Sequence, residues 1–141
     1  MKKILVINGV NLNMLGIRET SIYGNNTYKD LKKKISQYAK TKHVYVEYFI
    51  SNYEGAIVTK IQRMGNKYDG LIINPGAYSH YSIAILDALK ILNVPIIEVH
   101  ISDITKREEF RKKSITALAA LKVIMGHGFD GYLMAIDELL K

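Results

Sequence analysis

The stretch "ILVINGVNLNMLGIRETSIYG", residues 4–24, decides how the fold is interpreted. Its first four residues are all aliphatic, without the polar alternation of a half-exposed strand, which predicts a strand covered on both faces of a parallel sheet. A long polar loop, residues 11–24, follows in place of the short turn that usually leads into a helix. This loop carries one arginine, Arg18, and one tyrosine, Tyr23. Its length after a strand end predicts a functional role.

Similar apolar runs recur along the chain and alternate with helical patterns. Strands are predicted at residues 4–7, 44–50, 70–73, 95–99 and 122–125. Apolar residues at helical spacing predict helices at 28–38, 57–64, 83–92 and 132–140. Thr27 and Asp30 form a capping box at the start of the first of these helices. The alternation predicts one α/β domain, residues 1–141, in which a doubly wound, five-stranded parallel sheet lies between two helical layers.

Composition narrows the class of protein. A formal net charge of +7 arises largely from a lysine-rich helix, which is either a solvated face, a field that attracts an anionic substrate, or a nucleic-acid patch. Aromatic residues do not interleave with the lysines, so nucleic acid is not expected as a partner. The chain has no cysteine and no apolar stretch long enough for a membrane span or a signal peptide. A cytoplasmic protein is therefore expected.

The strand ends are where the polar residues gather. In doubly wound sheets, ligands bind outside the carboxyl ends of the strands. The second strand leads into "SNYEG", the third into "NPGAYSHYS" and the fourth into "EVHIS". These segments and the loop 11–24 are expected to form the site.

Glu98 and His100 are two residues apart on a predicted strand, so both side chains point to the same face. A carboxylate next to a histidine can fix its tautomer and suit it to general acid or base chemistry. The alternative is a core histidine satisfied by hydrogen bonds, which this pair alone leaves equally open.

Asp87 interrupts an apolar helical pattern, and His80 lies seven residues earlier, which at helical spacing places it on the same face two turns away. A carboxylate in such a run is rarely buried without a partner. Asp87 is expected either to join a local network or to face a subunit interface.

Several other functions lack their required signals. "GHGFDG" at 126–131 matches the glycine spacing of a dinucleotide site, but that site needs a following strand and an acidic residue about 20 positions further on, and only ten residues follow Gly131. The four histidines lack metal-ligand spacing, so no metal is expected. A flavin site would need a shorter, smaller loop after the first strand. A receiver domain would need an aspartate where Asn74 stands.

Together, five segments resemble the type II 3-dehydroquinate dehydratases. They are "INGVNLNMLGIRETSIYG", "SNYEG", "INPGAYSHYSIAILDAL", "VPIIEVHISDITKREEFRKKS" and "IMGHGFDGY", in order and over nearly the full length. The resemblance implies a flavodoxin-like fold and dehydration of 3-dehydroquinate to 3-dehydroshikimate in the shikimate pathway, towards chorismate and the aromatic amino acids. It implies no metal, no cofactor and no Schiff base, and a homododecamer built from four trimers.

The resemblance also assigns roles to residues. Tyr23 would be the base with Arg18 as its charge partner, and His100 the acid oriented by Glu98. Asn11 would stabilise an enolate through a water. The substrate-binding residues would be Asn74, His80, Ile101, Ser102, Arg111 and, from a neighbouring subunit, Asp87. The chain departs from the usual motif in having Val10 and Thr20 in place of prolines and Asp103 in place of asparagine.

Overall fold

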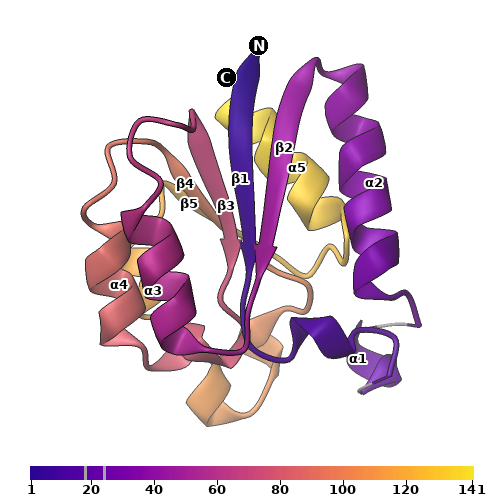
Figure 1. The fold of residues 1–141 in the computed structure, drawn as a ribbon. Helices are drawn as coiled ribbons and strands as arrows, with labels where there is room; N and C mark the ends of the chain where they lie inside the picture. Colours follow the sequence, from indigo (N-terminus) through magenta and orange to yellow (C-terminus); the bar gives the residue numbers. More distant parts are fainter. Residues whose placement is uncertain (18, 24) are drawn as a thin grey trace.

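The computed structural model describes residues 1–17, 19–23 and 25–141, with only the backbone of Tyr23. Its centre is a five-stranded sheet in the order β2-β1-β3-β4-β5 (Figure 1). All neighbouring strands run parallel. The strands are β1 Lys2–Asn8, β2 Val44–Ile50, β3 Gly70–Asn74, β4 Ile96–His100 and β5 Lys122–Met125. The predicted fold class is confirmed, and this strand order is that of flavodoxin-like sheets.

Helices cover both faces of the sheet. In Figure 1, α3 and α4 lie on one side of the strands, and α2 and α5 lie on the other. Each pair of helices closes its own hydrophobic core against the sheet. The helices are α1 Thr20–Tyr23, α2 Tyr28–Thr41, α3 Glu54–Gln62, α4 Ile83–Leu89 and α5 Asp130–Leu139. None of the helices in the described ranges has the length and apolarity that a membrane crossing requires.

Local sequence explains where α2 begins and how it packs. The capping box is present: the Asp30 amide donates to Thr27 Oγ1 at 3.2 Å, and the Thr27 amide donates to Asp30 Oδ2 at 2.9 Å. These bonds satisfy amides that the first turn of a helix leaves without partners. Leu31 and Ile35, four residues apart, are fully buried against the sheet.

The loops at the carboxyl ends of the strands contain most of the short helical turns. These are η1 Leu12–Met14, η2 Gly76–His80, η3 Ile104–Lys106 and η4 Glu109–Arg111, whereas η5 Thr116–Ala119 lies just before β5. The predicted polar loop 11–24 therefore contains η1 and α1. Leu12 and Leu15 are buried and join the core on the α2 and α5 side, which anchors the beginning of this segment.

The structure corrects one predicted helix. The helix predicted at 83–92 begins at Ile83, as predicted, after the cap Ser82, but it ends at Leu89. The Ser82 hydroxyl accepts from the Ile85 amide at 3.0 Å, so the backbone is not helical between η2 and α4. His80 belongs to η2 and Asp87 to α4. The expectation that one helix presents both on the same face was wrong.

Candidate functional site

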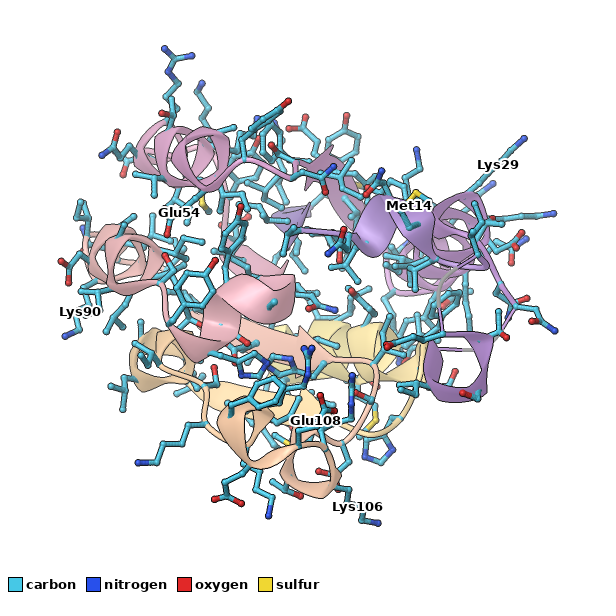
Figure 2. The ribbon with its side chains drawn as sticks, turned by 90° about the horizontal axis from the view of Figure 1, so that it is seen from below. Met14, Lys29, Glu54, Lys90, Lys106 and Glu108 are labelled. Atoms are coloured by element: carbon cyan, nitrogen blue, oxygen red, sulfur yellow. The ribbon has the colours of Figure 1, made fainter. Side chains whose placement is uncertain are left out.

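A cavity of about 110 Å³ opens at the carboxyl ends of β1, β3 and β4. Figure 2 views the molecule from this end, with Glu108 towards the middle of the view and Lys106 at the rim. The predicted site residues that line the cavity are Asn11, Asn74, His80, His100, Ile101, Ser102 and Arg111. The strand-end rule thus located the cavity correctly. This volume is smaller than the about 300–1,000 Å³ of pockets for drug-sized ligands, so the cavity suits a smaller molecule.

Two glycines bring the loops after β1 and β3 into direct contact. A Cβ at Gly9 would lie 2.2 Å from the Pro75 carbonyl oxygen, and one at Gly76 would lie 2.6 Å from the Val10 carbonyl oxygen. Gly76 also has a φ of +65°, which glycine adopts without steric cost. The backbones therefore pack at a distance that any side chain would prevent. This contact closes one wall of the cavity.

Asn11 has the left-handed backbone conformation, with φ 68° and ψ 0°. Asparagine tolerates this region better than most residues other than glycine. Its amide donates to Asn52 Oδ1 at 2.9 Å, and the Tyr78 hydroxyl donates to the Asn52 carbonyl at 2.6 Å. The "SNYEG" segment after β2 therefore supports Asn11 from behind, without lining the cavity itself.

Glu98 and His100 form a buried pair on β4, as their spacing predicted. Glu98 is fully buried and His100 is 5% exposed. The Glu98 carboxylate contacts His100 Nε2 at 2.7 Å. It also accepts from the Ser114 hydroxyl at 2.5 Å and from the Thr116 hydroxyl. A buried carboxylate with this many donors is compensated for the loss of water.

The partners of the two cavity histidines define their neutral tautomers. An ionised carboxylate only accepts, so the hydrogen of the His100 ring lies on Nε2, and Nδ1 has no hydrogen-bond partner among the described residues. His80 Nδ1 contacts the Lys113 carbonyl oxygen at 2.8 Å. Because a carbonyl also only accepts, the hydrogen of the neutral His80 ring lies on Nδ1. The two rings therefore have opposite tautomers.

A chain of hydrogen bonds holds the Asn74 side chain from below the cavity. Asn74 Oδ1 accepts from the Gly76 amide at 3.1 Å, and its Nδ2 donates to the Tyr132 hydroxyl at 3.0 Å. That hydroxyl in turn donates to Asn8 Oδ1 at 2.5 Å. Burial raises the pKa of Tyr132 far above its ordinary value, so this hydroxyl keeps its proton. Both ends of the Asn74 amide are consequently fixed in orientation.

Two arginines line the side of the cavity formed after β4. Arg107 donates to Ser102 Oγ at 3.2 Å and lies 3.6 Å from Glu19. Arg111 donates to Glu108 at 3.0 Å. The resulting positive charge suits an anionic ligand, and the carboxylates around it keep both guanidinium groups oriented.

Asp103, one of the departures from the usual motif, has a defined local role. Its carboxylate accepts from the Thr105 amide at 3.0 Å and from the Thr105 hydroxyl at 2.6 Å, which caps η3. The hydrogen bond from the Thr105 hydroxyl holds the pKa of Asp103 below its usual range. Aspartate therefore supplies the turn-starting oxygen that asparagine would otherwise provide.

Two predicted site residues in the described part of the chain, Glu98 and Asp87, do not line the cavity. Glu98 lies behind His100. Asp87 is exposed on α4 and, among the described residues, has no hydrogen-bond or ion-pair partner, so it joins no local network. Its place at a subunit interface stays a prediction. Arg18 lies outside the described residues, as does the side chain of Tyr23.

Sequence reasoning missed other residues of the site. Arg107 lines the cavity together with Leu12, Gly76, Ala77 and Ile104. The strand-end rule pointed to the segment of Arg107, but no pattern distinguished it from the neighbouring cations. Ser114, Thr116 and Tyr132 act behind the cavity wall. Their partners are 16 to 124 residues away in sequence, so no local signal identifies them.

The comparisons with known proteins agree over the full length. The model of the family described as dehydroquinase class II matches residues 2–140. A 3-dehydroquinate dehydratase of Clostridium botulinum is 54% identical over 141 residues, which cover 100% of this chain and 96% of the relative. One of Clostridium acetobutylicum is 56% identical over 137 residues, or 97% and 95% of the two chains.

A solved structure matches equally well. The crystal structure of a type II dehydroquinase from Butyrivibrio crossotus superposes with a TM-score of 0.97 at 54% sequence identity. The superposition covers 99% of this chain and 98% of the other. Similarity therefore extends over the sheet, both helical layers and the loops at the strand ends.

Proposed function

Because the chain belongs to the class II dehydroquinase family, we propose that it dehydrates 3-dehydroquinate to 3-dehydroshikimate in the shikimate pathway. The observation that carries this proposal is the buried Glu98–His100 pair, whose histidine lines a small cavity together with Arg107 and Arg111. The pair provides an acid next to a space for an anionic substrate. The product would feed the synthesis of chorismate and the aromatic amino acids.

The chemistry divides into two proton transfers. A base removes the proton next to the ketone, and the electron pair of that C–H bond moves onto the carbonyl oxygen as an enolate. We assign Tyr23 as the base and Arg18 as the cation that favours its phenolate form. Asn11 stabilises the enolate through a water. The enolate then collapses and expels the hydroxyl, which leaves as water with the Nδ1 proton of His100; the ring is an imidazolium at this step, and its Nε2–H stays bonded to Glu98.

The remaining cavity residues bind the substrate. Asn74, with its amide fixed by Tyr132 and Gly76, offers its remaining N–H to a hydroxyl or carboxylate oxygen. His80, Ser102 and the backbone at Ile101 add further polar contacts. Arg111 supplies positive charge for the substrate carboxylate.

We further assign Asp87 to the active site of a neighbouring subunit. Its exposure on α4 and its lack of a partner among the described residues support this role. The assembly would be the dodecamer of four trimers expected from the resemblance, located in the cytoplasm. The reaction needs no metal, cofactor or Schiff base, since the side chains supply both proton transfers.

The direct test is to add 3-dehydroquinate to the purified protein and to follow the absorbance of the conjugated enone product. We expect steady formation of 3-dehydroshikimate, which is lost in His100→Ala. The same substitution provides the control against a contaminating dehydratase, because a contaminant would be unaffected by it. Absence of product from the folded wild-type protein would overturn the proposal.

A further inference from the structure

The Glu98 carboxylate is held by two hydroxyls from a single short segment. Ser114 and Thr116 both donate to it, Ser114 to the oxygen that also contacts His100 and Thr116 to the other oxygen. Thr116 is fully buried and, like Glu98, has no access to water. Each carboxylate oxygen is thus fixed by a protein hydroxyl. The plane of the carboxylate, and with it the direction of its bond to His100, is determined.

The same segment also fixes the second cavity histidine. The Lys113 carbonyl accepts from His80 Nδ1, and the Ile115 amide donates to the Ser79 carbonyl at 2.7 Å. Residues 113–116 therefore contact η2 through the backbone and β4 through the two hydroxyls. None of these four residues lines the cavity.

We propose that Ser114 and Thr116 are positioning residues of this site, which keep the Glu98 carboxylate in the orientation that holds the Nε2–H of His100. Nδ1 is then left towards the cavity, where it carries the proton that the imidazolium form donates. The kinetic part of this inference rests on the proposed function. Neither residue touches the substrate; both act through Glu98. The proposal gives a role to Ser114 and Thr116, to which the resemblance assigned none.

The physical argument concerns what remains when a hydroxyl is removed. Without Thr116 Oγ1, one oxygen of a fully buried carboxylate has no donor, a situation that proteins rarely leave uncorrected. The carboxylate then turns to find a new donor, and its other oxygen no longer aligns with His100 Nε2. A neutral imidazole released from this constraint distributes its hydrogen over both ring nitrogens.

The two hydroxyls differ in how cleanly they test this idea. Ser114 Oγ also accepts from the Ala117 amide at 3.2 Å, so its loss would weaken the turn η5 as well. Among the described residues, the only hydrogen-bond partners of Thr116 Oγ1 are Glu98 and Ser114. Thr116→Val preserves shape and removes the hydroxyl, whereas Thr116→Ser preserves the hydroxyl. This pair is therefore the primary comparison.

A matched control is available at Ser79, which is fully buried and whose hydroxyl has no hydrogen-bond partner among the described residues. Ser79→Ala removes a buried hydroxyl next to the same segment without affecting Glu98. We expect wild-type kcat, KM and His100 spectra from this variant. If Ser79→Ala reproduces the effect of Thr116→Val, the effect is one of packing and the proposal fails.

The first readout is the tautomer of His100, measured by ¹⁵N NMR of the ring and assigned by comparison with His100→Ala. We expect an Nε2–H imidazole in the wild type and in Thr116→Ser, and a mixture of tautomers in Thr116→Val. An unchanged His100 spectrum in Thr116→Val would refute the proposal. If that variant does not fold, Ser114→Ala carries the decision, with the same expected spectrum.

The second readout is the pattern of kinetics with 3-dehydroquinate. Thr116→Val should lower kcat about tenfold with little change in KM, short of the 10²–10⁴-fold typical of losing a general acid outright. Thr116→Ser should restore the rate. In the His100→Ala background Thr116→Val should have no further effect, because both act through one group. A full tenfold loss in that background would show that Thr116 acts independently of His100.

The two measurements separate this inference from the proposed function. The NMR experiment needs no substrate and judges the orientation of His100 even if the protein does not dehydrate 3-dehydroquinate. A wild type without turnover but with the expected spectra would refute the function and keep the structural inference. Normal turnover of the wild type, with identical His100 spectra in all variants, would keep the proposed function and refute the structural inference.

Discussion

Tyr132→Phe removes a single oxygen from the interior of the protein, and the structure allows its cost to be worked out. The hydroxyl donates to Asn8 Oδ1 and accepts from Asn74 Nδ2, and all three side chains are buried. Phenylalanine would leave both amide atoms without a partner. Asn8 Nδ2 already has none among the described residues, so Asn8 would have no remaining side-chain hydrogen bond.

Each buried polar atom left without a partner costs about 1–3 kcal/mol. Two such atoms should therefore lower the free energy of unfolding by about 2–4 kcal/mol, because neighbouring losses are not fully additive. Substrate binding should weaken as well, since Asn74 loses the contact that orients its amide. We expect KM to rise more than kcat falls.

Urea unfolding, followed by circular dichroism at equal protomer concentrations, measures the stability change. Tyr38→Phe is the matched control: its hydroxyl donates to Asp137 at 2.6 Å near the surface, where water can replace it. That substitution should cost less than about 1 kcal/mol. If Tyr132→Phe is no more destabilising than Tyr38→Phe, the hydrogen-bond chain does not support Asn74 as argued.

The same substitution should change the alkaline limb of stability. Burial raises the pKa of Tyr132 in the folded state above the ordinary tyrosine value of about 10. The neutral hydroxyl therefore stabilises the fold fully below about pH 10, and this contribution is lost as the pH rises further and the unfolded tyrosine ionises. Unfolding free energies between about pH 8 and 11 should fall less steeply in Tyr132→Phe than in the wild type.

Three further predictions concern the proposed reaction. His100→Ala should retain exchange of the substrate α-proton with solvent, observed by NMR, while elimination falls about 10²–10⁴-fold; equal loss of both would place His100 earlier in the reaction. Asp87→Ala should weaken assembly and raise KM, measured by sedimentation and kinetics, whereas a fully active wild-type monomer would contradict this. Tyr23→Phe should bind substrate with turnover reduced at least ~10²-fold, and more than about a tenth of the wild-type rate would exclude Tyr23 as the base.

Much of the fold could be predicted because its determinants are local. β2 was predicted with its observed bounds, and β3 and β4 each differ by one residue at their ends. Continuous aliphatic runs mark strands that are covered on both faces, and the capping box fixes the start of α2. The rule that ligands bind at the carboxyl ends of the strands then pointed to the segments whose residues line the cavity, without any knowledge of their contacts.

The predictions failed where tertiary contacts, or a local cap, outweigh periodicity. His80 and Asp87 fit a helical spacing, but Ser82 caps the start of α4 between them. A serine directly before an apolar run is a typical helix cap, and an argument from spacing alone does not use that signal. The support for Asn74 could not be predicted, because Tyr132 is 58 residues away in sequence. From the sequence, Ser114 and Thr116 look like ordinary turn residues, because only the folded structure shows that both contact Glu98.

The position of β4 has a consequence for the order in which the protein would lose its parts. All five residues of β4 are buried, and the strand lies between β3 and β5 inside the sheet. Hydrogen exchange at such a strand requires nearly global unfolding, whereas Thr20, Ser21 and Ile22 of α1 are exposed and can open at little cost. His100, the acid of the proposed reaction, thus lies on a well-protected strand of the sheet. Tyr23, the proposed base, belongs to α1, a short helix of low local stability. On gentle warming, activity should be lost before the sheet begins to melt, and it should return as soon as α1 closes again.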